Sequence, residues 1–419
     1  MSEMSTTRRT FLAAGAAAPF VWAASKTDSK YKILGEGDHQ YECIHDWGEL
    51  PSNIKYGNTH SVAEDSQGHI YIHHTVYKDS QSPDSVVVFD PKGKFVRSFG
   101  AMFRGGAHGM HLNKEGKTEY LYFCDEKHGI ITKRTLKGEE VWTMGYPQDS
   151  PIYQKGPGST GPGGAAGLNY RPTNFAIAPN LDFWVGDGYG SYYMFHYSQA
   201  SSTSYPKLVK TFGGPPAGQA QGGGRGPGAG AGRGAEKGAG RGAGGRGGEK
   251  GGPPQAAAGG GGRGPANPPP PGQPGVPRDV PIESMNNPHG NMIDLRDPAN
   301  PILLVADRGN SRIVRYKLDD TPIDVVAGTK SPCHFHTYKD TIVVPDLQAR
   351  VTLLDKDNKI ILHLGEPTVP NPPRTTENRS DFIPGQFVQP HGAIFDHAGN
   401  IFVAEWVEIG RVTKLRKVA

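Results

Sequence analysis

A short pattern of strands and turns recurs along this chain, and it restricts the fold more than any other feature. In its clearest copy, residues 287–320, one strand begins at His289, a second ends at Asp307, and a third begins at Arg312. The other five copies open near His60, His108, Thr173, Cys333 and His391. Repeats of this kind stack on one another, because a single unit cannot bury its apolar face alone.

The copies predict an all-β protein. Within each copy, apolar residues alternate with polar ones in short runs, and Gly, Asn and Asp separate the runs. This alternation is typical of antiparallel strands joined by hairpins, and no long segment has helical periodicity. Six antiparallel sheets packed in a ring bury both faces of each sheet, so the sequence predicts a six-bladed β-propeller.

The two ends of the chain predict how the ring closes. The last copy stops after its third strand, at residues 411–417, and an unassigned strand lies at residues 41–48. A sheet that lacks its fourth strand has a free edge, which folded proteins avoid. We therefore expect the N-terminal strand to complete the last blade.

The N-terminus resembles a twin-arginine (Tat) export signal. Arg8 and Arg9 precede a mildly apolar segment, residues 12–24, which ends in small residues. The segment is too short to span a bilayer as a stable helix. The sequence thus predicts a signal peptide at 1–24 and a propeller at 25–419. Export by the Tat route to the periplasm or the extracellular space is expected, with no membrane span.

A low-complexity insert interrupts the propeller at 214–280. It consists almost wholly of Gly, Pro, Ala and Arg, which explains much of the total of 59 Gly and 36 Pro. Such a segment cannot bury enough apolar surface to order itself, so it is predicted to be disordered. Several of the arginines behind the net charge of +4 lie there, so no nucleic-acid partner is predicted. Three cysteines, far apart, make no disulfide framework.

One aligned position offers metal ligands. The residues that begin the innermost strands are His60, His108, Thr173, His289, Cys333 and His391. Innermost strands line the axis of a propeller, so His108, His289 and His391, from alternate blades, are predicted to converge. Three imidazoles with an open fourth position suit a catalytic zinc, and another divalent transition metal is the alternative. The competing interpretation is that each imidazole only bonds a backbone carbonyl.

Three more histidines lie near the same position in the copies. They are His60, His111 and His334. Imidazole is a common metal ligand, but a histidine in a strand also packs well. These three are therefore interpreted either as further ligands or as packing residues.

Two turns are predicted on the same face as the histidines. The second strand of each blade returns to the face where the first begins, and the turns that follow carry Tyr189 and Arg308. Tyr189 is a candidate general base or acid, and Arg308 is a candidate for binding a substrate carboxylate. The alternatives are a tyrosine that packs on its neighbour and an arginine that bridges blades. The recurring aspartates are predicted to cap these turns: Asp125, Asp187, Asp307 and Asp346.

These motifs resemble NHL repeats, and residues 305–313 (Val-Ala-Asp-Arg-Gly-Asn-Ser-Arg-Ile) resemble the NHL turn. Within that group the chain most resembles the peptidyl-α-hydroxyglycine α-amidating lyase, from about residue 58 to the C-terminus without the inserts. The resembling motifs are Ala107-His108-Gly109, Arg171-Pro172-Thr173-Asn174, Asp187-Gly188-Tyr189, Pro288-His289, Ala306-Asp307-Arg308 and Pro390-His391.

The resemblance implies a function. In that family the three histidines hold zinc, which implies His108, His289 and His391 here. It also implies that Tyr189 acts as base on the substrate hydroxyl and that Arg308 assists. The reaction is cleavage of a C-terminal α-hydroxyglycine to a peptide amide and glyoxylate, so the expected partner is a peptide C-terminus or a small molecule. A monomer is expected.

The chain departs from that family at two places. The family has a further catalytic arginine in its first blade, where this chain reads Gly57-Asn58-Thr59-His60, and Arg104 or Arg171 are the candidate replacements. The family's third histidine is followed by an aspartate that helps to bind structural calcium, whereas His391 is followed by Gly392. A calcium site would therefore lack its expected aspartate.

Two other functions are compatible with the sequence. One is a metal-dependent hydrolase, or a lyase of the streptogramin type, on the same scaffold. The other is a non-catalytic NHL propeller that binds peptide, glycan or protein partners. Fold analogy alone selects none of them.

Overall fold

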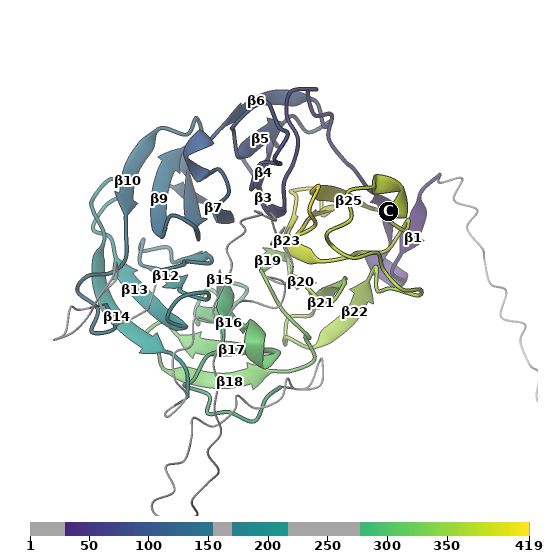
Figure 1. The fold of residues 1–419 in the computed structure, drawn as a ribbon. Coiled ribbons are helices and arrows are strands. Elements are labelled where there is room, and N and C mark those ends of the chain that lie inside the picture. The colour runs from purple at the N-terminus through teal and green to yellow at the C-terminus, as the bar shows by residue number, and fades with distance from the viewer. Residues whose placement is uncertain (1–29, 154–169, 217–276, 419) are drawn as a thin grey trace, which may run out of the picture. The chain divides into compact units, whose positions relative to one another are not determined.

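The computed structural model describes residues 30–153, 170–216 and 277–418. Six antiparallel sheets surround a common axis in the unit Tyr31–Ala419 (Figure 1). Helical structure in the described residues is limited to short 3-10 turns, and none is long and apolar enough to cross a membrane. The predicted signal at 1–24 and residues 217–276 of the predicted insert lie outside the described residues. The predicted all-β, six-bladed fold is confirmed.

The blades follow one another along the chain, and each runs from an innermost to an outermost strand. Blade one contains β3 (Thr59–Glu64), β4 (Ile70–His74), β5 (Val86–Phe89) and β6 (Phe95–Phe99), and blade two contains β7 (Ala107–Glu115), β8 (Thr118–Asp125), β9 (Ile130–Thr135) and β10 (Glu140–Met144). Blade three contains β11 (Phe175–Ile177), β12 (Phe183–Gly186), β13 (Tyr193–Ser198) and β14 (Lys207–Gly213). Blade four contains β15 (Pro288–Asp294), β16 (Ile302–Asp307), β17 (Arg312–Lys317) and β18 (Pro322–Val326), and blade five contains β19 (His336–Tyr338), β20 (Thr341–Asp346), β21 (Arg350–Leu354) and β22 (Ile360–Leu364).

Blade six is built from both ends of the chain. It contains β23 (Pro390–Phe395), β24 (Ile401–Glu405) and β25 (Arg411–Lys417), followed by β2 (Tyr41–Ile44) and β1 (Lys32–Leu34). Strand β2 pairs with β25 so that Tyr41 lies opposite Lys417 and Cys43 opposite Leu415. The predicted closure is confirmed, and β1 adds a fifth strand at the outer edge.

The apolar core is divided among the six interfaces between neighbouring blades. In the interface of blades six and one, for example, Ile72 and Phe89 of blade one pack with Phe402 and Ala404 of blade six. Each of the other five interfaces has a cluster of its own. One blade alone would expose two apolar faces, so burial is complete only in the closed ring.

The innermost strands of blades three and five are shorter than the repeats predict. Strands β11 and β19 begin after Thr173 and Cys333, which therefore lie just before the strands. A proline precedes each of these residues, as Pro288 and Pro390 precede His289 and His391, so proline does not explain the later start. Thr173 and Cys333 nevertheless stay bonded to the second strands through Gly186 and Pro345.

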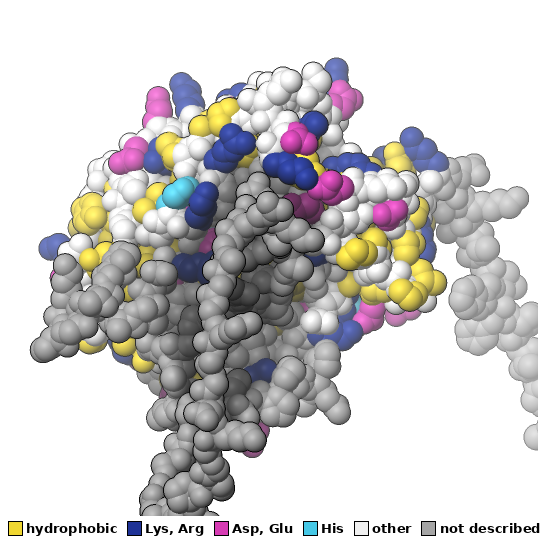
Figure 2. Space-filling model, in the orientation of Figure 1, with side chains coloured by type: hydrophobic (Ala, Val, Ile, Leu, Met, Phe, Trp, Pro, Cys, Tyr) yellow, Lys and Arg dark blue, Asp and Glu magenta, His cyan; other side chains and the backbone are white. Residues whose placement is uncertain are grey.

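Charged side chains of both signs share the surface. On the face drawn in Figure 2, Lys and Arg side chains are interspersed with Asp and Glu side chains over the described residues. No single-sign patch stands out in this view of them.

Closure of the ring by β1 and β2 predicts a large loss of stability on truncation. A chain that starts at residue 46 lacks the buried side chains of Leu34 and Tyr41. Burial of a large apolar side chain contributes about 1.5–3 kcal/mol, so the free energy of unfolding should fall by at least about 3 kcal/mol in urea denaturation. A chain that starts at residue 30 is the control and should match the full chain. Equal stability of all three would contradict the closure.

Candidate metal centre

Four histidines reach the axis from irregular points in the innermost strands. His60, His108, His289 and His391 each lie where the pairing of the first and second strands shifts register. A bulge of this kind turns a side chain out of the regular alternation of the strand. The four imidazoles therefore leave their sheets and meet at the axis.

Three of these histidines make the same bond to the next blade. Each uses Nδ1 as donor to the backbone carbonyl at the matching position of the neighbouring blade. The pairs are His108 with Thr173 at 2.7 Å, His289 with Cys333 at 2.8 Å and His391 with His60 at 3.0 Å. Because a carbonyl only accepts, Nδ1 carries the proton and Nε2 is an unprotonated acceptor. This is how metal-binding histidines are usually oriented.

A glycine after each of these histidines permits the close approach. A Cβ atom on Gly109, Gly290 or Gly392 would lie only 2.2–2.5 Å from the same carbonyl oxygen that the histidine bonds. Any side chain there would push the blades apart. At Gly392, this also excludes the aspartate that the related calcium site would need.

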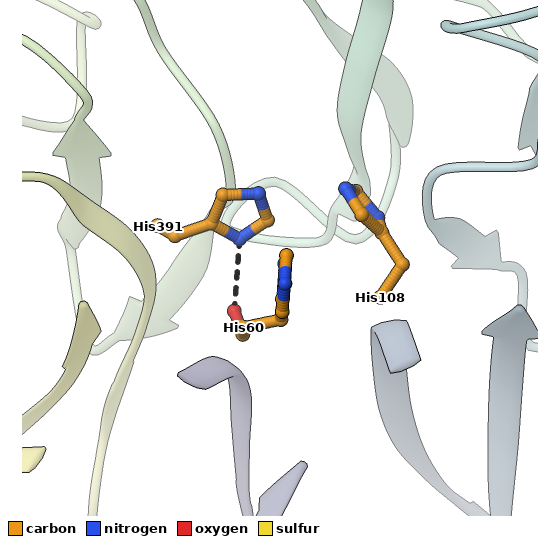
Figure 3. A group of neighbouring side chains, drawn as sticks. All are labelled: His60, His108 and His391. Atoms are coloured by element: carbon orange, nitrogen blue, oxygen red, sulfur yellow. Dashed lines mark hydrogen bonds between the residues drawn. The ribbon is translucent and has the colours of Figure 1, made fainter. Parts of the chain in front are cut away.

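The predicted trio of rings is brought together. Ring centroids are 4.8 Å apart for His108 and His289, 4.9 Å for His108 and His391, and 4.7 Å for His289 and His391. His60 joins them, at 5.0 Å from His108 and 4.6 Å from His391 (Figure 3).

The candidate donor atoms form two overlapping groups. Among the described residues, all donor atoms lie within 4.8 Å of one another in His60–His108–His391 and in His289–Cys333–His391. The predicted trio is not one of these groups, although its two members His108 and His391 share the first group. Ligation by His108, His289 and His391 therefore stays a prediction.

The residues present fit a metal ion. Nε2 of His391 and Nδ1 of His60 are buried and have no hydrogen-bond partner among the described residues. Burial lowers the pKa of His108 to about 3 and holds the pKa of His289 and His391 well below the usual value, so the rings are neutral at pH 7. Neutral imidazoles with inward lone pairs are ligands for zinc, copper, iron and nickel.

Tyr189 and Arg308 lie beside the histidines, on the turns that the repeats predict. The Tyr189 hydroxyl is 3.3 Å from Nε2 of His108 and 3.1 Å from Nε2 of His289, and Arg308 donates to it at 3.1 Å. A hydroxyl has a single proton, so it donates to one imidazole at a time while it accepts from Arg308. Burial raises the pKa of Tyr189, and the Arg308 charge opposes that shift.

Arg171 connects this centre to a cavity. Its guanidinium lies 5.1 Å from the centroid of the Tyr189 ring and pairs with Glu126. The cavity has a volume of about 460 Å³ and is lined by Glu126, Lys127, His128, Gly129, Tyr146, Tyr170 and Arg171. Arg104, the other candidate for the missing arginine, is exposed to solvent.

Two other predicted histidines, His334 and His111, are not in either group of donor atoms, whereas Cys333 is in one of them. His334 is turned towards blade six, where its Nδ1 donates to the Ala393 carbonyl at 3.0 Å. His111 lies three residues beyond His108 in β7 and is half-buried. Cys333 was not predicted as a ligand, although it occupies the aligned position that indicated the histidines. Its thiol lies 3.8 Å from Arg308, and burial raises its pKa to about 11.

Carboxylates at the turns fix the entrance to the innermost strands. Asp125, Asp187 and Asp346 cap their turns as predicted, whereas Asp307 accepts no backbone N–H from its own turn. Three of these four aspartates also accept from a backbone N–H that precedes an innermost strand. Asp187 accepts from Arg171 N, Asp307 from Asn286 N and Asp346 from Ser331 N. In blade six, Glu405 accepts from Val388 N in the same way. This role was not predicted, because the recurring residue in the other blades is aspartate.

Fold and centre together define a six-bladed β-propeller with four imidazoles on its axis. No protein-family model matches the chain, and no curated protein matches it. Similar solved structures include a streptogramin B lyase, at 10% identity, with 91% of this chain and 99% of that chain covered and a TM-score of 0.46. A virginiamycin B lyase from Staphylococcus aureus with quinupristin is 10% identical, with 90% of this chain and 100% of that chain covered and a TM-score of 0.46. A gluconolactonase from Xanthomonas campestris is 10% identical, with 93% of this chain and 96% of that chain covered and a TM-score of 0.48.

These structures are similar in fold, and at this level of identity the likeness extends no further. The resemblance to the amidating lyase rests on the motifs of the sequence itself.

The buried neutral histidines predict an acid-sensitive metal-free protein. The pKa of His108 is about 3 in the folded state and about 6.5 when exposed, so below pH 6.5 the unfolded state binds more protons. The free energy of unfolding should therefore fall as the pH falls from 6.5 towards 3, by about 1.4 kcal/mol per pH unit for this one ring. Urea denaturation at several pH values, in the presence of a chelator, measures this dependence of the free energy of unfolding on pH. A His108→Asn variant should show a shallower slope, and equal slopes would contradict the prediction.

Proposed function

We propose that the chain is a metal-dependent lyase that cleaves a peptidyl-α-hydroxyglycine to a peptide amide and glyoxylate. The observation that supports it is the position of the Tyr189 hydroxyl, in contact with His108, His289 and Arg308 at once. A base next to metal-ligand candidates is what removal of a hydroxyl proton requires.

The proposed ligands of the metal are His108, His289 and His391, with zinc or another divalent transition metal as the ion. A bound divalent ion would supply Lewis acidity to an oxygen of the substrate. The Nδ1 bonds to Thr173, Cys333 and the His60 carbonyl keep the three rings oriented for it. The surrounding burial excludes water and strengthens each electrostatic contact.

In the proposed reaction Tyr189 takes the proton of the substrate hydroxyl. The O–H electron pair forms the aldehyde C=O bond of glyoxylate, and the C–N bond breaks with its electron pair going to nitrogen. That nitrogen receives a proton, which Tyr189 returns, and leaves as the peptide amide. Arg308, at 3.1 Å from the Tyr189 oxygen, stabilises the ionised form of the tyrosine. No oxidant or reductant is needed.

The proposed place for the peptide part of the substrate is the cavity beside Arg171. Arg171 lines this cavity and its guanidinium lies 5.1 Å from the centroid of the Tyr189 ring, so a substrate held in the cavity would lie near Tyr189. A cavity of about 460 Å³ is within the size range of small-molecule sites.

The proposal predicts a bound metal. Purified protein should contain about one divalent transition metal ion per chain, and a His108/His289/His391 triple-alanine variant should contain none. A ligand present at 100 times its Kd stabilises a fold by about 2.7 kcal/mol, so a chelator should lower the Tm of the wild-type chain alone. Elemental analysis and thermal unfolding measure both effects. A folded wild-type chain that takes up no metal would instead favour a non-catalytic binding propeller.

Tyr189→Phe should abolish most of the activity while it leaves the metal content unchanged. Loss of a general base lowers kcat by about 10²–10⁴-fold, whereas the phenyl ring still packs beside Arg171 and Arg308. The measurement is glyoxylate release from an α-hydroxyglycine peptide. Tyr205→Phe, at an exposed tyrosine, is the matched control and should keep full activity. Undiminished release by Tyr189→Phe would exclude the proposed base.

A further inference from the structure

His60 breaks the pattern of the other histidines. The His108 carbonyl, which its Nδ1 would bond if the pattern continued, is taken by the Ser61 hydroxyl at 2.8 Å. Nδ1 of His60 is left buried without a partner among the described residues, and the side chain is only 6% exposed. A buried ring nitrogen of this kind needs a partner.

The neighbours of His60 are other imidazoles. Its ring lies between those of His108 and His391, and donor atoms of all three lie within 4.8 Å of one another (Figure 3). Nε2 of His391 is also buried without a partner among the described residues. One cation between the rings would satisfy both nitrogens.

We propose that His60 is a fourth imidazole ligand of the metal, together with His108, His289 and His391. This inference rests on the proposed function for the presence of the metal.

The spacing of the rings fits imidazoles that share one ion. Five of the six ring pairs have centroids 4.6–5.0 Å apart. With nitrogens about 2.1 Å from a metal, ring centroids lie roughly 4.6 Å apart at a right angle and roughly 5.3 Å apart at the tetrahedral angle. His391 belongs to both groups of donor atoms, so it links His289 to His60 and His108.

Blades three and five contribute Tyr189 and Cys333 beside the histidines. The Cys333 thiol is already engaged, since it donates to the Ser331 carbonyl at 3.4 Å and contacts Arg308. The imidazoles are therefore the ligands that the centre would offer to a divalent transition metal.

Cobalt(II) titration tests the proposal, because the visible bands of cobalt report its binding to the protein. Wild-type protein should bind one cobalt ion. His60→Gln and His289→Gln should each bind at least about tenfold more weakly, since loss of even an outer partner of a ligand costs 10–100-fold. His74→Gln is the matched control: His74 is an equally buried histidine of blade one outside the centre, and it should bind as the wild type.

The outcomes separate this inference from the proposed function. Wild-type affinity in His60→Gln, with weak binding in His289→Gln, would overturn the fourth ligand and leave the three-histidine lyase intact. Absence of cobalt and zinc binding in the wild-type chain would overturn both. If His60→Gln does not fold, X-ray absorption of the cobalt-loaded wild-type chain decides. Four imidazoles would support the proposal, and three would contradict it.

Discussion

The bond from a histidine Nδ1 to a carbonyl of the next blade is the interaction on which the centre depends. It occurs at every second blade interface, in the pairs His108–Thr173, His289–Cys333 and His391–His60. The same bond joins two blades and leaves Nε2 as the inward acceptor. The packing of the blades and the orientation of the imidazoles therefore depend on each other, because a change in the spacing of two blades would break the bond that orients the imidazole.

A second layer of carboxylates supports this arrangement. Asp307, Asp346 and Glu405 each pair with a buried arginine at the start of the third strand of the same blade. A buried ion pair tolerates the loss of neither partner. These acids also hold the backbone before the innermost strands, so the entrance to blades four, five and six is rigid where His289, Cys333 and His391 are presented.

The sequence was sufficient for the ring and for the alignment of the candidate ligands, but not for their contacts. Alternation and turn residues are local, so the six copies, the closing strand and the alignment of His108, His289 and His391 could be read from them. The bulges that turn these rings inward depend on the neighbouring blade, and so does the loss of a carbonyl partner at His60. The contact of Arg308 with Tyr189 joins two blades across a turn, which no local pattern encodes.

The composite sixth blade gives assembly a fixed order in time. During synthesis β1 and β2 emerge before blades one to five, whereas their partner β25 emerges after these blades. His391 lies in the same late blade, on β23. The ring can therefore close only after β25 has been made, and a product that ends before β23 would lack both the closing strand pair and His391.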